Sequence, residues 1–98
     1  MLKYINQVNV KFSPFAKNAR TPRIFLSRVM MDEARLLNPH IKINTTVFTD
    51  INAQPSISVT FRDGKTLDFA TEAMKIDDVL NVVKKHARKL RDLEEANS

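Results

Sequence analysis

The chain of 98 residues contains no cysteine, no tryptophan and a single glycine. Without cysteine it has no disulfide, no thiol nucleophile and no thiolate ligand for a metal. One glycine does not supply a glycine-rich phosphate loop. No apolar run approaches the roughly 18 residues of a membrane span, and the first residues lack the pattern of a secretory signal. We therefore expect neither membrane insertion nor secretion.

Acidic residues are the minority among the charged ones. Sixteen Lys and Arg stand against 11 Asp and Glu, which gives a formal net charge of +5 and a sequence pI of about 9.8. The length and the 43% hydrophobic content fit one soluble globular domain over residues 1–98. A basic excess in so small a chain favours an anionic partner, nucleic acid before an anionic membrane. The alternative is a soluble protein that is basic without binding either.

Alternation of apolar and polar residues, the period of a half-buried strand, occurs in four segments. The predicted strands are residues 8–12, 41–47, 56–62 and 67–69. Between the last two, Asp63 and Gly64 form a pair typical of a two-residue hairpin turn.

Helical spacing of apolar residues occurs in two further segments. The first predicted helix begins at Thr21, as N-cap before a proline at the first helical position. It ends either near Met31 or near Leu37, because acidic residues interrupt its apolar stripe between these points. The second predicted helix runs from about Ile76 to about Glu95.

The order β-α-β-β-β-α predicts an α/β fold with a four-stranded mixed sheet. A right-handed crossover makes the first two strands parallel, and we expect the spatial order 2-1-3-4. Because every strand alternates, we expect one buried sheet face with both helices on it. The opposite face is then predicted to carry Asn9, Lys11, Lys42, Asn44, Thr46, Phe48, Ser58, Thr60 and Arg62.

Residues that often carry catalysis or bind metals are isolated in this sequence. His40 and His86 lie on different elements, and His86 flanks an apolar stripe, which indicates a packed histidine. Asp77 and Asp78 point about 100° apart on a helix, so capping is expected rather than acid–base chemistry. Ser13 has no base in its sequence context. We expect no enzyme activity, no cofactor and no metal.

Basic residues cluster on the last predicted helix, where they are candidates for RNA binding. Lys84, Arg88 and Arg91 fall within about 60° of one another. Lys85 and Lys89 lie at the far edge of the same polar face. A solvated surface is the alternative, but like charges four residues apart repel by a few tenths of a kcal/mol. An unpaired cluster of this kind favours contact with phosphate.

A second basic group lies before and within the first helix. Arg20 and Arg23 are close to a helix N-terminus, whose free N–H groups favour phosphate oxygens. Lys17 and Lys11 complete the set of candidate RNA-binding residues. Most aromatic residues fall at core positions, so we expect recognition of the shape and backbone of folded RNA. Phe15 and Phe48 are expected to be exposed and to contact protein.

The turn after the first strand resembles the strand-to-helix turn of thioredoxins. Ser13 and Ala16 stand where thioredoxins carry their two cysteines, and Pro55 stands where they have a cis-proline. The resemblance implies a thioredoxin-like fold and a cis bond at Pro55. It also leaves a redox or glutathione-binding enzyme as an alternative, which the missing thiols oppose.

Three segments resemble a family that unites certain mitochondrial ribosomal proteins with the B8 accessory subunit of respiratory complex I. They are F-S-P-F with A-R at 12–15 and 19–20, N-P-H-I-K-I at 38–43, and V-T-F-R-D-G-K at 59–65. Ser13 and Ala16 depart from the family's Asn and Gly.

The lack of cysteine and the basic last helix favour the ribosomal large-subunit members of this family. The resemblance implies a structural protein of the mitochondrial large ribosomal subunit, located in the matrix. Its implied partners are rRNA and neighbouring ribosomal proteins, with no small-molecule substrate. The alternative is a complex I accessory subunit without RNA contact.

Overall fold

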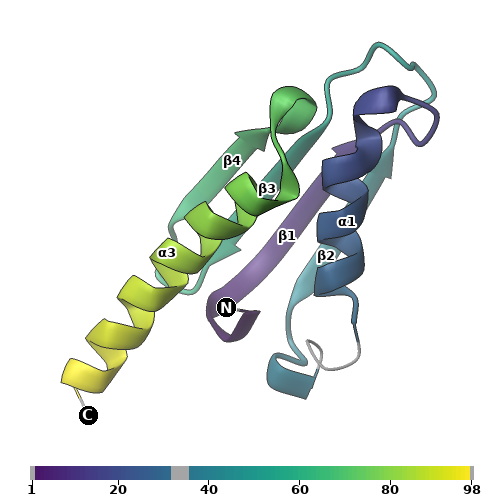
Figure 1. Ribbon diagram of the computed structural model, residues 1–98. Coiled ribbons are helices and arrows are strands. Elements are labelled where there is room, and N and C mark those ends of the chain that lie inside the picture. The colour runs from purple at the N-terminus through teal and green to yellow at the C-terminus, as the bar shows by residue number, and fades with distance from the viewer. Residues whose placement is uncertain (1, 32–35, 98) are drawn as a thin grey trace.

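The computed structural model describes residues 2–31 and 36–97, and its four strands form one mixed sheet (Figure 1). The strands are β1 (Ile5–Phe12), β2 (Lys42–Val47), β3 (Ser56–Phe61) and β4 (Thr66–Ala70). The helices are α1 (Arg20–Val29) and α3 (Ile76–Ala96), with 3-10 turns η1 (Leu2–Tyr4), η2 (Lys17–Ala19) and η3 (Thr71–Ala73).

The strand order in the sheet is β2-β1-β3-β4. β1 and β2 are parallel, with Val8 opposite Ile43. β3 is antiparallel to both β1 and β4. The predicted α/β fold, the order of its elements and the parallel first pair are confirmed.

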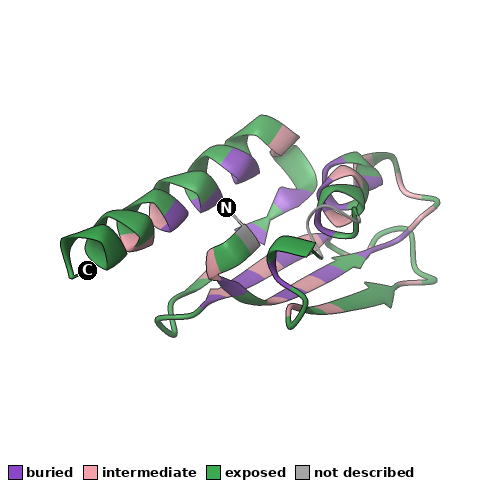
Figure 2. Ribbon diagram, turned by 90° about the horizontal axis from the view of Figure 1, so that it is seen from below, coloured by how far each residue is buried: buried purple, intermediate pink, exposed green. Residues whose placement is uncertain are grey.

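Both helices cover the same face of the sheet (Figure 2). Alternate residues of β1 and β3 are buried against them, as the two-residue period predicts. The largest fully buried side chains include Phe25 of α1 and Phe61 of β3. The stripe of α3 contributes Val79, Val83 and Ala87 to the same core. The predicted one-sided sheet is therefore confirmed.

The start of α1 differs from the sequence prediction. The helix begins at Arg20, directly after η2, and no side chain caps it. The Thr21 hydroxyl donates instead to the carbonyl oxygen of Met74 at 2.6 Å. Thr21 is thus not an N-cap, because η2 runs directly into the helix. Its hydroxyl instead links α1 to the segment that follows η3.

The end of α1 agrees with the shorter of the two predicted helices. α1 ends at Val29, and Met30 and Met31 form a turn and a bend. The longer alternative runs across residues 32–35, which lie outside the described residues. Leu37 is helical again but belongs to a separate, exposed segment.

Pro55 corrects the expectation of a cis bond. The described residues contain no cis peptide bond, and Pro55 is among them. The trans isomer is the default, favoured by about 0.5–1 kcal/mol before proline. Here Pro55 leads straight into β3, and its carbonyl accepts the Thr71 N–H at 3.3 Å. The thioredoxin likeness does not extend to this feature.

The predicted hairpin between β3 and β4 is confirmed, but its loop has three residues, 62–64, and not two, because the Phe61 N–H donates to the Lys65 carbonyl at 2.8 Å. Gly64 has a φ of +89°, a backbone conformation that glycine adopts without strain. Its N–H donates to the Phe61 carbonyl at 3.0 Å, and the Asp63 carboxylate accepts the Lys65 N–H at 3.0 Å.

β2 is less buried than its alternation predicts. Its register with β1 places Ile43, Thr45 and Val47 on the helix side of the sheet. Val47 is nevertheless 56% exposed, and no residue of β2 is fully buried. The main contacts of α1 with the sheet are to β1. The helix side of β2 therefore remains largely open.

Candidate RNA-binding surfaces

Three basic residues of α3 line one cavity, as their spacing predicts. Lys84, Arg88 and Arg91 surround a depression of about 220 Å³ together with Tyr4 of η1. The opposite side of α3 is fixed in the core, so the backbone under these residues is rigidly placed. We call these three residues the α3 triad.

The charge of the α3 triad is largely uncompensated. Neither Lys84 nor Arg88 forms an ion pair with another described residue. Arg91 lies 3.6 Å from the carboxylate of Asp92, and both side chains are more than half exposed. Such a surface pair contributes little. The α3 triad therefore presents free positive charge to solvent.

Tyr4 places a phenol beside these cations. Desolvation raises the pKa of its phenol, and the Glu94 carboxylate adds to the rise. Lys3 approaches both groups, at 3.5 Å from Glu94 and 5.6 Å from the Tyr4 ring centre. The Tyr4 hydroxyl is hydrogen-bonded to the Glu94 carboxylate, so its single donor is already used within the chain.

Lys85 and Lys89 lie on α3 outside the cavity. Since successive helix residues are about 100° apart, Lys85 and Lys89 point away from the core, whereas the α3 triad lies along one side of the helix. Both are exposed, and neither forms an ion pair with another described residue. They add to the positive field of the helix.

The second basic group lies where η2 meets α1. Lys17, Arg20 and Arg23 are exposed and line a depression of about 390 Å³. The first turn of α1 contains no acidic residue and no side-chain cap, so positive side chains stand at the positive end of its dipole.

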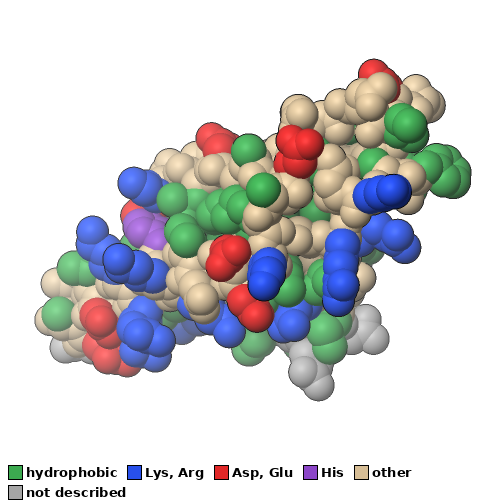
Figure 3. Space-filling view, turned by 45° about the horizontal axis from the view of Figure 1, so that its top comes forward, with side chains coloured by type: hydrophobic (Ala, Val, Ile, Leu, Met, Phe, Trp, Pro, Cys, Tyr) green, Lys and Arg blue, Asp and Glu red, His purple; other side chains and the backbone are tan. Residues whose placement is uncertain are grey.

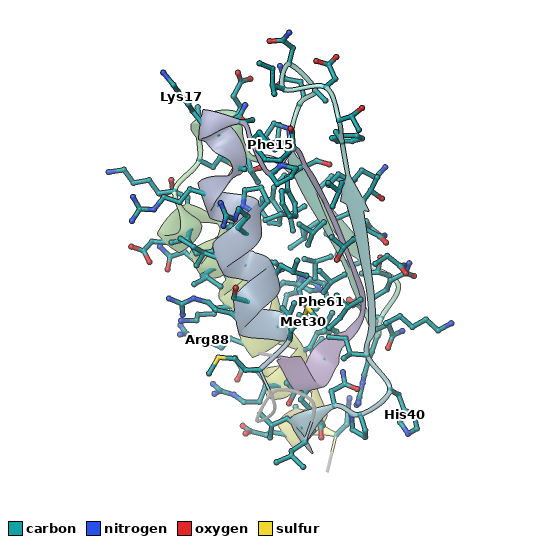
Figure 4. The ribbon with its side chains drawn as sticks, turned by 90° about the vertical axis from the view of Figure 1, so that its right-hand side faces the viewer. Phe15, Lys17, Met30, His40, Phe61 and Arg88 are labelled. Atoms are coloured by element: carbon teal, nitrogen blue, oxygen red, sulfur yellow. The ribbon has the colours of Figure 1, made fainter. Side chains whose placement is uncertain are left out.

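The two basic groups share the helix side of the molecule. Figure 3 shows Lys and Arg side chains spread over this face. Figure 4 shows Lys17 and Arg88 both projecting on the side away from the sheet. The predicted RNA-binding residues of the two helices are thus brought to one side.

Lys11 lies apart from the other candidates. Its neighbours in the sheet are Thr46 and Ser56, on the face that carries no helix. That face is polar, and its amides pair across strands: Asn44 donates to Asn9 at 2.9 Å. Lys11 therefore belongs to the polar sheet face and not to the cationic helix side.

The other singled-out residues have structural roles. His86 Nε2 lies 3.1 Å from a carboxylate oxygen of Asp63, and its ring packs edge-on against Phe61 with centres 4.5 Å apart. Asp78 accepts the backbone N–H of Lys75 at 3.1 Å. The predicted packed histidine and capping carboxylate are confirmed.

The turn from Ser13 to Ala16 holds no catalytic arrangement. Ser13 is buried, its Oγ has no hydrogen-bond partner, and its carbonyl accepts the Ala16 N–H at 3.1 Å. Ala16 is extended, with a φ of −82°, so the turn does not require the glycine that the family has here. Phe15 is 86% exposed, as predicted, whereas Phe48 is half-buried and not exposed.

Two general findings limit the chemistry of the described residues. Their His, Asp and Glu side chains form no group of three that can hold a metal ion. None of the helices in that part of the chain combines the length and the hydropathy that a membrane crossing requires.

Sequence reasoning missed Tyr4 and Lys75 as candidate site residues. Tyr4 reaches the α3 triad only because η1 packs beside α3. Lys75 reaches Lys17 and Arg20 only because η3 packs against η2. Both placements are tertiary, and no local pattern in the sequence signals them.

Comparison with known proteins gives one family. The family described as 39S ribosomal protein L53/MRP-L53 matches residues 12–64. The large ribosomal subunit protein mL53 of Saccharomyces cerevisiae is 27% identical over 89 residues, covering 90% of this chain and 88% of the relative.

Two further fungal relatives carry the same description. The mL53 protein of Neurospora crassa is 29% identical over 103 residues and covers 99% of this chain and 97% of the relative. That of Schizosaccharomyces pombe is 24% identical over 89 residues, covering 90% and 89%. The similarity thus extends over nearly the full length of each relative.

Proposed function

Because the chain belongs to the L53 family of mitochondrial large-subunit ribosomal proteins, we propose that it binds rRNA through its two basic helix surfaces. Its location is the mitochondrial ribosome, where it has a structural role. The proposal concerns what it touches there. The proposed function involves no thiol, no metal and no cofactor.

The α3 triad is the observation that supports this proposal most directly. Three cations gather at one cavity, and their one printed ion pair is the exposed Arg91–Asp92 pair. In the free protein the positive charges of these three side chains repel one another. Phosphate oxygens remove that repulsion and accept the available hydrogen bonds.

Binding in this mode depends on the phosphate backbone and not on base sequence. Each phosphate neutralised by Lys or Arg releases condensed counterions, so affinity falls as salt rises. The aromatic residues Phe25 and Phe61 are buried, and the polar sheet face presents amides and hydroxyls instead of stacking rings. The protein thus recognises the shape of a folded RNA.

Neighbouring ribosomal proteins are the proposed partners of the remaining surfaces. The polar sheet face offers mainly amides and hydroxyls, with Lys11 and Lys42 spaced apart on it, which suits a protein contact better than a phosphate contact. Phe15 projects from the end of β1 and provides an apolar anchor of the kind that protein interfaces enrich.

The test removes the charge of the α3 triad without changing the helix. The triple variant Lys84→Gln, Arg88→Gln and Arg91→Gln keeps helix propensity and leaves the core stripe intact. We expect the stability to change by less than about 0.5 kcal/mol per site. Association with large-subunit rRNA should weaken, and the log–log salt slope should become shallower by about one unit per lost contact.

A control variant loses the same charge elsewhere. Lys42, Arg62 and Lys65, on β2 and in the β3–β4 turn, are exposed and line neither of the two basic depressions. The control variant is Lys42→Gln, Arg62→Gln and Lys65→Gln. If this control weakens binding as much as the triad variant, net charge alone explains the association. If the triad variant binds with unchanged affinity and salt slope, α3 does not face RNA.

A further inference from the structure

The sheet ends at β2, which pairs with β1 on one side and with no other described strand on its outer side (Figure 1). The Phe48 N–H donates to the Phe12 carbonyl at 2.9 Å, so Phe48 turns its backbone groups toward β1. Because successive residues of a strand turn these groups to opposite sides, Ile43, Thr45 and Val47 direct theirs outward. Within the described residues, these N–H and C=O groups have no hydrogen-bond partner.

The helix side of the same strand is apolar and open. Ile43 packs partly against the core, whereas Val47 is 56% exposed. On α1, Ile24 lines the cavity beside the start of α3, so Leu26, about 200° further round the helix, faces β2. Met30, one turn after Leu26, lies on the same side and is 46% exposed. Figure 4, seen from the β2 side, shows Met30 between α1 and the sheet.

An unpaired backbone and an apolar side chain surface thus occur together. We call Leu26, Met30, Ile43, Thr45 and Val47 the β2 edge. A helix placed here would leave the outward N–H and C=O groups without partners, because the backbone groups of a helix bond within it. An extended segment provides these partners, as in the addition of a strand to an exposed sheet edge. The occupant that fits the β2 edge is therefore a strand.

The charges beside the β2 edge favour an acidic strand. Lys42, at the start of β2, is exposed, and it forms no ion pair with another described residue. Its neighbour in β1 is Gln7, and β2 itself contains no acidic residue. A carboxylate on a paired strand would neutralise Lys42. A second copy of this chain would instead bring a further net charge of +5 to the contact.

We propose that the β2 edge takes up an extended segment of a neighbouring protein as an additional strand of the sheet. Alternate residues of this segment are apolar and pack against Leu26, Met30 and Val47, and an Asp or Glu on its other face lies beside Lys42. This inference rests on the proposed contact with neighbouring ribosomal proteins, and it adds an interface separate from the polar sheet face. It does not depend on the RNA contact of the α3 triad.

Thr45→Pro tests the backbone pairing. Proline removes the outward N–H of this residue and leaves the bonds between β2 and β1 in place, as prolines do at natural sheet edges. We measure association with large-subunit particles that lack this protein, by sedimentation. The affinity should fall about fivefold, as for the loss of one hydrogen bond. Thr45→Ala, which keeps the N–H, is the matched control and should lose clearly less.

Val47→Lys tests the apolar side and does not depend on a proline. A lysine at this exposed position is compatible with the fold but places a charge against the incoming apolar residues, so association should weaken about tenfold. Thr46→Lys, the next residue, adds the same charge on the polar sheet face and is the control. A melting curve of each variant confirms that it is folded before binding is measured.

Lys42→Glu tests the charge match. The new carboxylate would face the acidic residue of the incoming strand, so association should weaken. Lys65→Glu, in the β3–β4 turn, makes the same charge change away from β2 and is the control. Equal losses in the two variants would overturn the acidic character of the partner.

Crosslinking identifies the occupant. With p-benzoylphenylalanine in place of Val47 in assembled large-subunit particles, we expect a crosslink to a protein segment that has apolar residues at alternate positions and an Asp or Glu. A crosslink to rRNA or to a second copy of this chain would overturn the proposal, as would unchanged association of both Thr45→Pro and Val47→Lys. Both variants should bind isolated rRNA like the unchanged protein, whereas the α3 triad variant should not, so either contact can fail while the other holds.

Discussion

The two helices cover the same sheet face but begin in opposite electrostatic settings. α3 has Asp77 and Asp78 in its first turn, and Asp78 accepts the Lys75 N–H. α1 has no acidic residue in its first turn, and Arg20 occupies its first position. Carboxylates at a helix start stabilise it, whereas cations there oppose the dipole. The partial positive charge at the start of α3 is thus neutralised by carboxylates of the same chain. The start of α1 has no such carboxylate and favours an anion from another molecule.

The helices also differ in how they are held. α3 is 21 residues long and α1 has ten, yet each contributes four buried residues. α1 depends on the fully buried Phe25 and Val29 and on the Thr21 hydrogen bond to Met74. A short helix whose start lacks a favourable dipole partner is stabilised by its tertiary contacts more than by its own sequence.

The largest effect is expected from Phe25→Ala. The side chain is fully buried, so its removal should cost about 3–5 kcal/mol of unfolding free energy. Val83→Ala, at an equally buried position in α3, should cost less because a smaller volume is lost. Urea unfolding of both variants measures the difference. Equal losses would show that α1 does not depend on this anchor.

Thr21→Val should have the next largest effect. The valine keeps the volume but leaves the Met74 carbonyl without its donor, at a cost of about 1–3 kcal/mol. Ser27→Ala removes a hydroxyl that bonds within α1 to the Arg23 carbonyl and is exposed. That control should change the unfolding free energy by less than about 0.5 kcal/mol. A small loss in Thr21→Val would mean that the tie is dispensable.

Arg20→Glu tests the electrostatic contrast directly. A carboxylate at the start of α1 should raise the stability of the free protein by about 0.3–1 kcal/mol. Asp77→Asn, at the start of α3, should lower it by a similar amount. Arg20→Glu should at the same time weaken RNA binding. Stabilisation of both variants, or of neither, would contradict the dipole argument; thermal melts at low salt give the answer.

The smallest expected effect is on the stability of the protein at low pH, through Asp63. The Lys65 N–H holds the pKa of Asp63 below its usual value, opposed by partial desolvation and supported by His86 of α3. A lowered pKa in the folded state stabilises the protein above the unfolded pKa of about 3.9. This contribution is lost as pH falls through the folded value. Urea midpoints between pH 2 and 6 should therefore fall less steeply in Asp63→Asn than in the unchanged protein.

Most of the fold follows from local patterns in the sequence. The predicted elements include β1 and β3, from their alternation, the turn at Asp63–Gly64, and α3, from its apolar stripe. The strands and the helix are predictable because the period of their apolar residues shows which face is buried. The clustering of the α3 triad follows from helix geometry in the same way.

The features that sequence reasoning missed depend on how the elements pack. β2 alternates like its neighbours, yet α1 lies over β1 and leaves Val47 exposed. Thr21 has the sequence of an N-cap but bonds to Met74, 53 residues away. Thr71 gave no signal at all, since its burial results from the packing of η3 against η2 and β3.

The open edge of β2 bears on how this chain behaves in isolation. Its outer backbone groups have no strand partner among the described residues, and Val47 and Ile51 are more than half exposed beside it. Lys42 is the one charged residue in the strand. An unpaired edge with so little charge recruits the edges of other molecules. We therefore expect copies of the free protein to associate through this strand as their concentration rises.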